Sequence, residues 1–535
     1  MKIEFVGGAR TVTGSSYIIK DQDFTIMVDC GMFQGKQELV QRNQLQLIYD
    51  PPKIDCLLLT HAHIDHSGLI PKLVKGGFYG NIYTTKSTTD LCKVMLPDSA
   101  HIQENDIKWV NKRNKKLGRP QVEPLYTLED ADNSIDNFVP VNYGEIIQIH
   151  PRVEVRFRDA GHILGSSFIE MWVAEKGKKT KIVFSGDIGT KDQSIIRDPE
   201  LLEDADIILI ESTYGNRLHK SKEDTYTEFK EILLDSINKK GNIIIPAFAI
   251  ERTQEIIYEL NKLFSNGEIP RVPVYIDSPL AISATEIFRQ NPQCFDEDTL
   301  KILNSGDNPL DFPNLKFTKT SEESKLLSKE KGGAIIISAS GMCTAGRIKY
   351  HLQNNLYRSE SSVIFVGYQA EGTLGRRIID GAKQVKIYGE DIAVNAKVHT
   401  LGGFSAHADM NGLLEWLRPN KNPNTKVFVV HGEEESSEHF AKVISKELGL
   451  SSYVPHWGEI VDLDTMKSEY ASYGTPSEEK YLPVDSQIES LTNTMNLLIK
   501  KYDRAKAENR LEYIKTLQDD INDVKEMIAV IIDEL

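Results

Sequence analysis

The sequence has few cysteines and no long apolar run. Its five cysteines, Cys30, Cys56, Cys92, Cys294 and Cys343, are scattered and form no C-x-x-C pair. This pattern excludes a disulfide framework and predicts reduced, mostly buried thiols. No run of about 18 apolar residues occurs, so no membrane-spanning helix and no membrane partner are expected. The chain starts with a strand-like segment, residues 1–6, and lacks a basic-then-apolar leader, which predicts a cytoplasmic protein.

Basic residues are fewer than acidic ones, because 63 Lys and Arg stand against 78 Asp and Glu and give a formal net charge of −15 at pH 7. Phosphate neutralisation by Lys and Arg supplies most non-specific affinity for nucleic acids, so this balance argues superficially against such a partner. Basic residues are nevertheless concentrated in residues 108–119, Lys-Trp-Val-Asn-Lys-Arg-Asn-Lys-Lys-Leu-Gly-Arg. That segment is either a grip for a strand backbone or a solvated helical face, and the sequence leaves both interpretations open.

The most informative stretch that is present is His61-Ala62-His63-Ile64-Asp65-His66. It follows a predicted buried strand, residues 54–60, so its side chains can converge at a strand end. His61 and His63 can reach one ion, and Asp65 and His66 can reach a second beside it. Neutral imidazole and carboxylate are standard zinc ligands, and the density of the cluster favours a two-metal site over a polar surface loop.

Three further candidate ligands lie at strand ends elsewhere in the chain. His162 follows the predicted strand 153–157, Asp187 follows 182–184, and His431 follows 427–430. Each one alone would more often be a turn residue. Their recurrence beside strand ends, together with the histidine cluster, favours metal ligands.

Length and pattern predict more than one domain. The 535 residues exceed the roughly 250 to 300 that a single core supports. Between about residues 214 and 394, apolar runs alternate with helical patterns at 242–246, 274–277, 334–338 and 363–367. Continuous apolar runs of this length predict parallel strands covered on both faces.

The C-terminal residues, 466–535, have a different pattern. A polar stretch, 467–479, is typical of a linker, and apolar residues then recur at a/d spacing from Ile488 to Tyr502 and from Ile514 to Leu535. The two seams predict a helical hairpin. They indicate either a homodimer or partner-protein contact, or a hairpin packed on its own body, and the sequence leaves both open.

These motifs resemble the metallo-β-lactamase fold and, more narrowly, its β-CASP nuclease branch, over roughly residues 1–460. The matching positions are Asp29 in Met-Val-Asp-Cys-Gly, the His61–His66 cluster, His162, Asp187, Glu211 in Ile-Glu-Ser-Thr-Tyr-Gly, His407 in Phe-Ser-Ala-His-Ala-Asp, and His431. The opening residues 7–15 are also similar to the start of RNA-processing members, including the endonuclease of pre-mRNA 3′-end formation.

The resemblance implies an α/β fold, namely an αββα sandwich with an inserted β-CASP cap. Residues 1–213 would form the first part of the sandwich, 214–394 the cap, 395–465 the second part of the sandwich, and 466–535 the linker and helical tail outside the resemblance.

It also implies a site with two Zn²⁺ per chain. His61, His63 and His162 would hold one ion, Asp65, His66 and His431 the other, and Asp187 would bridge both. Asp29 would orient the ligand loop as an outer carboxylate. His407, oriented by Glu211, would protonate the leaving oxygen as the general acid.

The inserted cap carries candidate phosphate contacts. Arg252 stands at a predicted helix start, where a guanidinium and free N–H groups favour a phosphate. Ser338, Ser340 and Gly341, and further on Arg376, lie in small-residue loops that lead into helices.

The implied function is that of a zinc-dependent ribonuclease acting on RNA, most readily single-stranded, with endonuclease action favoured and 5′ exonuclease action left open. A DNA nuclease of the same fold is one alternative, but His431 replaces the apolar valine typical of that branch. A small-molecule metallo-hydrolase would not need the insertion or the Glu211 and His407 pair. A metal-free RNA-binding scaffold would have lost ligands, and here all are present.

Overall fold

The computed structural model describes residues 1–471 apart from 46, 176, 328–331 and 371, together with residues 495 and 499. The chain divides into two compact units, Met1–Glu469 and Tyr470–Leu535. The predicted a/d seams, the helical hairpin and the association through it lie outside the described residues.

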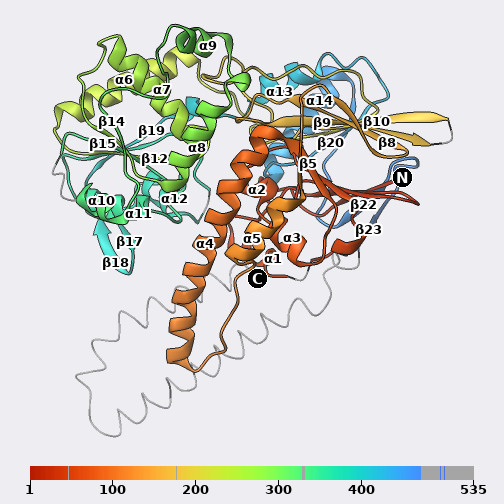
Figure 1. The fold of residues 1–535 in the computed structure, drawn as a ribbon, viewed down its shortest axis with the longest axis horizontal. Helices are drawn as coiled ribbons and strands as arrows, with labels where there is room; N and C mark the ends of the chain where they lie inside the picture. The colour runs from red at the N-terminus through yellow and green to blue at the C-terminus, as the bar shows by residue number, and fades with distance from the viewer. Residues whose placement is uncertain are drawn as a thin grey trace. The chain divides into compact units, whose positions relative to one another are not determined.

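Two sheets form the larger part of the first unit (Figure 1). The eight-stranded sheet has the order β23-β22-β1-β2-β3-β4-β5-β6, and the seven-stranded sheet has the order β21-β20-β11-β10-β9-β8-β7. The strands of the first sheet are β1 Lys2–Phe5, β2 Tyr17–Lys20, β3 Thr25–Val28, β4 Cys56–Leu58, β5 Asn81–Thr85, β6 Phe138–Val141, β22 Glu459–Asp462 and β23 Ser468–Tyr470. Those of the second are β7 Ile146–His150, β8 Val153–Asp159, β9 Ser167–Glu175, β10 Lys178–Phe184, β11 Ile207–Ile210, β20 Lys426–Val429 and β21 Ser451–Tyr453.

The two sheets pack face to face around an apolar core. β8 shows why, because its residues alternate between buried and partly exposed, with Val153, Val155 and Phe157 turned inward. Phe5 of the first sheet meets Phe428 of the second, with ring centroids 5.3 Å apart. Each apolar face of a half-exposed sheet is thereby removed from water.

Helices cover the outer face of each sheet. On the eight-stranded sheet, apolar residues of α3 and α4 pack with strand residues such as Met27 and Ile82. On the seven-stranded sheet, α13 and α14 pack against β10, β11 and β20. The bounds on this side of the chain are α1 Gln37–Arg42, α2 Ile64–Ser67, α3 Ile70–Lys75, α4 Lys86–Leu117, α5 Leu128–Ser134, α13 Met410–Leu417 and α14 Glu434–Leu448. The layers are helix, sheet, sheet, helix, which confirms the predicted αββα class.

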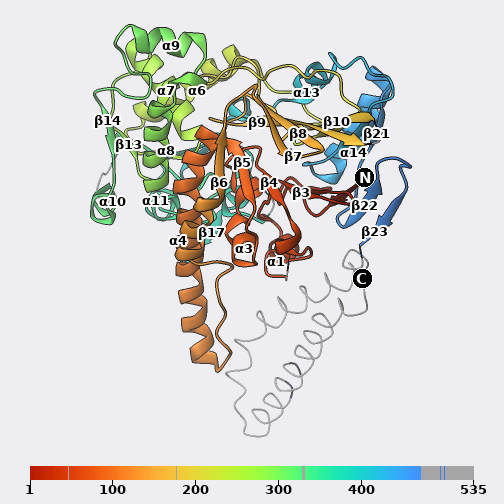
Figure 2. The same ribbon diagram turned by 45° about the vertical axis from the view of Figure 1, so that its right-hand side comes forward.

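A six-stranded sheet of order β14-β13-β15-β12-β16-β19 forms the cap (Figure 2). Every pairing in it is parallel, and β12, β15 and β16 are buried along their whole length, as the continuous apolar runs predict. Its strands are β12 Ile243–Pro246, β13 Val274–Ile276, β14 Leu315–Phe317, β15 Ile335–Ser338, β16 Ser362–Phe365 and β19 Lys397–Thr400, with the hairpin β17 Gln384–Ile387 and β18 Glu390–Ala393. Its helices are α6 Lys222–Asn238, α7 Arg252–Ser265, α8 Pro279–Gln290, α9 Glu297–Asn304, α10 Ser321–Leu327, α11 Ile348–Asn355 and α12 Leu374–Ile379.

The cap is an insertion between neighbouring strands. β11 and β20 lie side by side and parallel, although more than 200 residues separate them. The return to the sandwich comes later than the predicted residue 395, because β19 pairs with β16 in the cap sheet. Likewise β23 extends the eight-stranded sheet beyond the predicted boundary at 465. Both strands are short and mostly polar edge strands, so neither shows the apolar pattern of a buried strand.

All five cysteines are free and buried, as predicted. None of the described helices is long and apolar enough to cross a membrane.

Candidate metal centre

The candidate metal centre lies at the carboxyl end of β4, next to one end of the seven-stranded sheet. β4 is fully buried and delivers His61, which is 0% exposed. His63 precedes the single helical turn α2, and that turn directs Asp65 and His66 to the other side. A strand end followed by one helical turn therefore separates the four side chains into two pairs, as the sequence predicts.

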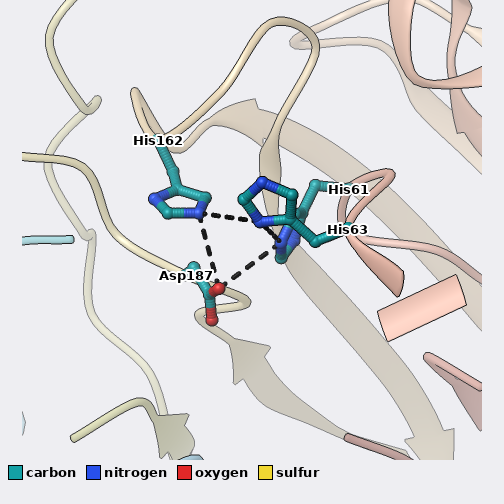
Figure 3. Close-up of side chains that lie close together, drawn as sticks. All are labelled: His61, His63, His162 and Asp187. Carbon is teal, nitrogen blue, oxygen red and sulfur yellow. Dashed lines mark hydrogen bonds and ion pairs between the residues drawn. The ribbon is translucent and has the colours of Figure 1, made fainter. Parts of the chain in front are cut away.

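One group consists of His61, His63, His162 and Asp187 (Figure 3). Nδ1 of His63 lies 3.2 Å from Nε2 of His61 and 3.3 Å from Nε2 of His162. Oδ2 of Asp187 lies 3.4 Å from His61 Nε2 and 3.5 Å from His162 Nε2. A tetrahedral zinc ion with bonds of about 2.0 to 2.1 Å has ligand atoms about 3.3 to 3.4 Å apart, so this group fits one.

The second group consists of Asp65, His66 and His431. Here the other oxygen of Asp187, Oδ1, lies 3.3 Å from His66 Nε2 and 3.5 Å from His431 Nε2. Asp187 thus presents one carboxylate oxygen to each group. Its Oδ1 and the Nε2 of His66 are buried and have no hydrogen-bond partner among the described residues, which is costly unless a cation completes the site.

The electrostatics favour the metal-binding form of four of these side chains, three imidazoles and the shared carboxylate. Burial lowers the pKa of His63 and of His162 well below the usual value and that of His431 to about 3. Burial alone would raise the pKa of Asp187, but the imidazoles around it, above all His431, hold it well below its ordinary value. Neutral imidazole and ionised carboxylate are the donors that a divalent cation requires. His66 differs from the other imidazoles, because burial lowers its pKa but Asp187 outweighs burial and raises the pKa well above its usual value, so this side chain must release a proton when it binds a cation.

Asp29 orients His66 from behind. Its Oδ2 lies 2.7 Å from His66 Nδ1, which fixes Nδ1 as the donor and leaves Nε2 directed at Asp187. Thr60 holds the carboxylate in place, because its backbone N–H donates to Oδ1 at 2.8 Å. This is the position that a carboxylate outside the ligand shell takes beside a metal-binding histidine.

Replacing Asp29 by Ala should weaken zinc binding by the group that contains His66 more than zinc binding by the group that contains His162. Loss of such an outer carboxylate typically costs 10- to 100-fold in metal affinity or activity. Zinc titration followed by metal analysis measures the effect. Asp206→Ala, which removes a carboxylate at the far end of β11, is the control and should leave both affinities unchanged. Equal weakening in the two variants would contradict this role for Asp29.

His431 is held by a residue that the sequence did not single out. The hydroxyl of Ser15 lies 2.6 Å from His431 Nδ1, and the backbone N–H of His431 donates to the carbonyl of Gly8. The only sequence signal was the glycine-containing opening, residues 7–15. That segment folds over the second ligand group and sets the orientation of the His431 ring.

His407 and Glu211 lie beside the two groups. Nδ1 of His407 is 3.1 Å from Glu211 Oε2 and 3.8 Å from Asp187 Oδ2. Burial lowers the pKa of His407, but the carboxylates of Glu211 and Asp187 outweigh it and raise the pKa to about 9. Glu211 is fully buried, and the backbone N–H of Ile188 fixes its Oε1. His407 remains 22% exposed, so this imidazole can meet a substrate.

The loop that carries His162 is anchored from two sides. The hydroxyls of Thr85 and Thr88, at the start of α4, donate to the carbonyl of Gly165 at 2.7 and 2.8 Å. From the cap, Glu251 accepts the N–H of Leu164 at 3.1 Å. Glu251 has φ 69° and ψ −63°, a strained conformation that is rare outside glycine and closes a three-residue turn.

Glu251→Gln should stabilise the protein at high pH. Burial raises the pKa of Glu251 from 4.5 to about 8, so its contribution to stability is full below pH 4.5 and is lost as the pH rises through about 8. The amide keeps an acceptor for Leu164 but has no charge to bury. Melting temperatures should therefore favour the variant increasingly between these two pH values.

Glu268→Gln is the control of opposite sign. Hydrogen bonds from Asn266, Tyr226 and Lys230 lower the pKa of Glu268 from 4.5 to about 2, so its contribution is present above pH 4.5 and is lost as the pH falls. This variant should be less stable than the wild type at neutral pH, and the difference in stability should disappear in acid. The same pH trend in both variants would contradict the assignment of Glu251.

The five candidate phosphate contacts are placed differently from one another. Arg252 begins α7 as predicted, but it is only 6% exposed and is paired with Glu255, so its guanidinium is not presented to a phosphate. Ser338 is buried and donates to the carbonyl of Asp277. Arg376 pairs with Asp380. Ser340 and Gly341 form the turn after β15 at the carboxyl edge of the cap sheet, the edge where open α/β sheets bind ligands.

Comparison with known families places this fold and site. Three family descriptions match: the metallo-beta-lactamase superfamily over residues 9–139, the Beta-Casp domain over 253–378, and the Zn-dependent metallo-hydrolase RNA specificity domain over 391–455. The chain therefore belongs to the β-CASP family of the metallo-β-lactamase superfamily, as the sequence motifs predict.

Among its relatives is ribonuclease TTHA0252 of Thermus thermophilus, 36% identical over 85% of this chain and 99% of the relative. An RNase J-like protein of Methanocaldococcus jannaschii is 31% identical over 86% of this chain and 99% of the relative. The transcription termination factor FttA of the same organism is 29% identical over 85% of this chain and 70% of its own length.

Proposed function

We propose that the protein is a zinc-dependent ribonuclease that hydrolyses RNA phosphodiester bonds and holds two Zn²⁺ per chain. The observation that carries the proposal is the position of Asp187, which turns one oxygen to each of two ligand groups while His407 stands beside both. A site with two cations side by side suits the charge that develops on a scissile phosphate.

We assign the residues that would hold the ions to two sets. His61, His63 and His162 would hold one Zn²⁺, and Asp65, His66 and His431 the other, with Asp187 shared between them. When bound, zinc lowers the pKa of water towards neutrality and stabilises the charge of the attacking and leaving oxygens. Asp29 and Ser15 orient His66 and His431 through their Nδ1 atoms.

His407 would supply the proton to the leaving 3′ oxygen. Glu211 accepts a hydrogen bond from Nδ1, so the proton on Nε2 is the one available to a substrate. The neighbouring carboxylates favour the imidazolium, which is the form that a general acid needs. Glu211 is held by Ile188 next to Asp187, so the proton donor and the ligand sites share one rigid support.

RNA is the proposed substrate because the ribonuclease relative matches along almost its whole length and the RNA specificity domain spans residues 391–455. Single-stranded RNA and endonucleolytic cleavage are favoured, with 5′ exonuclease action as the second mode. Cytoplasmic location and association through residues 466–535 stay predictions.

Turnover of labelled single-stranded RNA and DNA of the same sequence tests the proposal. Cleavage of RNA that stops with chelator and returns with Zn²⁺ is the expected result. Products from RNAs with 5′-hydroxyl and 5′-monophosphate ends distinguish internal cleavage from stepwise release of mononucleotides. Preferential cleavage of DNA, or hydrolysis of small esters alone, would instead favour the alternative substrates.

A further inference from the structure

The second half of α4 forms an arm that extends from the metal centre. α4 spans 32 residues, and all its buried residues, from Ser87 to Ala100, lie in the first half. The second half extends away from the sheets in both ribbon views (Figures 1 and 2). We define the α4 arm as residues 101–125, the outer half of the helix and the segment that returns from it.

The arm is held in shape by its own return segment. Gly118 ends α4 in the left-handed conformation, and Asn111 exchanges two hydrogen bonds with the backbone of Val122, each 2.9 Å. Asn114 adds a bond to the carbonyl of Pro120. Most helical stability in proteins comes from tertiary packing, and the outer half of α4 has no buried residue, so these contacts give the arm an order that burial does not supply.

The tip of the arm concentrates positive charge. Residues 108–119 contain six cations and no acidic residue, in a chain whose net charge is −15. All six are exposed, and none forms an ion pair with a residue that the structure describes: Lys108, Lys112, Arg113, Lys115, Lys116 and Arg119. The helix dipole favours cations in the last turn of a helix, but only Lys115 and Lys116 lie in the last turn of α4. The other four cations need a different explanation.

An aromatic ring lies among these cations. Trp109 is 72% exposed, and the ammonium group of Lys112 lies 5.4 Å from its ring centroid. An exposed aromatic ring among cations that pair with no described carboxylate suits a particular kind of partner. That partner would have a flat π face for the ring and a negatively charged backbone for the cations. Single-stranded nucleic acid has both, since bases stack on aromatic side chains and phosphates meet Lys and Arg.

The base of α4, the helix that carries the arm, contacts the elements of the metal centre. Thr85 and Thr88 at the base of α4 hold the loop of His162, and α2 with Asp65 and His66 packs against α4. From Lys86 to Trp109 the helix rises about 35 Å. From these observations we infer that the α4 arm binds single-stranded RNA at a distance from the site of cleavage and selects substrates long enough to reach it. This inference rests on the proposed ribonuclease function.

Fluorescence anisotropy with zinc-loaded full-length protein and a labelled, phosphorothioate-substituted single-stranded RNA tests the inference. Trp109→Ala should weaken binding roughly 5- to 150-fold, the range for loss of one stacked base. Lys108→Glu with Lys112→Glu should weaken it at least as much and reduce the slope of log affinity against log salt by about 1.4, or about 0.7 per phosphate contact.

The matched control is Lys442→Glu with Lys446→Glu, an exposed pair of the same spacing on α14. It should bind RNA like the wild type. RNA too short to span about 35 Å should be cleaved equally by all variants, and so should bis(p-nitrophenyl) phosphate, because the arm does not touch the centre.

The outcomes separate the two proposals. If RNA affinity and salt slope are the same in the arm variants as in the wild type, the inference is wrong. A change in molar mass by light scattering without a change in RNA affinity would also overturn it and make the arm a protein contact. If the wild type hydrolyses the small diester but neither binds nor cleaves RNA, the ribonuclease proposal itself fails.

Discussion

Asp187→Ala should abolish RNA cleavage and empty most of the metal centre. The carboxylate faces His61 and His162 with Oδ2 and His66 and His431 with Oδ1, and its removal leaves only the imidazoles and Asp65 to hold the two proposed Zn²⁺. The loss of activity should exceed the roughly 10²- to 10⁴-fold effect of removing a general acid. Metal analysis beside RNA turnover measures both effects.

Asp206→Ala again serves as the control, because its carboxylate accepts the N–H of Lys181 at the opposite end of the sheet. It should keep full metal content and full activity. An Asp187→Ala protein that retained the wild-type metal content would show that the carboxylate is not shared between the two groups.

His407→Ala should separate proton transfer from metal binding. His407 meets Glu211 at 3.1 Å and Asp187 only at 3.8 Å, so its removal should leave the metal content intact. RNA cleavage should fall on the order of 10² to 10⁴-fold, the usual contribution of a positioned general acid. Turnover rate and metal content on the same preparation test both statements.

Asp187, Glu211 and His407 lie close enough to hold an ion themselves, so the reverse assignment has a defined signature. His407→Ala would then lose a metal while His431→Ala kept it. His439→Ala, an exposed histidine on α14, controls for the loss of an imidazole and should change neither quantity.

The sequence predicted most of the candidate site because its ligands are locally dense or mark strand ends. His61 to His66 are contiguous. The alternating pattern before His162 and the apolar runs before Asp187 and His431 located three more strand ends. These patterns need no knowledge of tertiary contacts. The structure brings all seven predicted ligands together in two groups that share Asp187.

What the sequence could not give are pairings between distant segments. Ser15 and His431 are 416 positions apart, and Glu251 and Leu164 are 87 apart, so no local period or motif connects them. Short polar edge strands such as β19 also lack the apolar signature of buried strands, and the cap boundary was therefore placed too early.

Arg252 shows a different limit. Its position at a helix start was predicted correctly, but its exposure was not, because burial depends on what packs around it. Glu255, one turn along the same helix, pairs with its guanidinium. The ring centroid of Phe404 lies 5.9 Å from the central carbon of that guanidinium. A carboxylate three residues after a cation at a helix start therefore offers that cation a partner within the helix, which competes with a phosphate.

Stepwise zinc titration of the chelated protein, with RNA cleavage measured at each addition, tests the central claim most directly. A centre whose two ion sites share Asp187 should stay nearly inactive through the first equivalent and gain activity with the second, and His431→Ala should bind one equivalent and remain inactive. Full cleavage activity after a single equivalent, in either protein, would contradict the account.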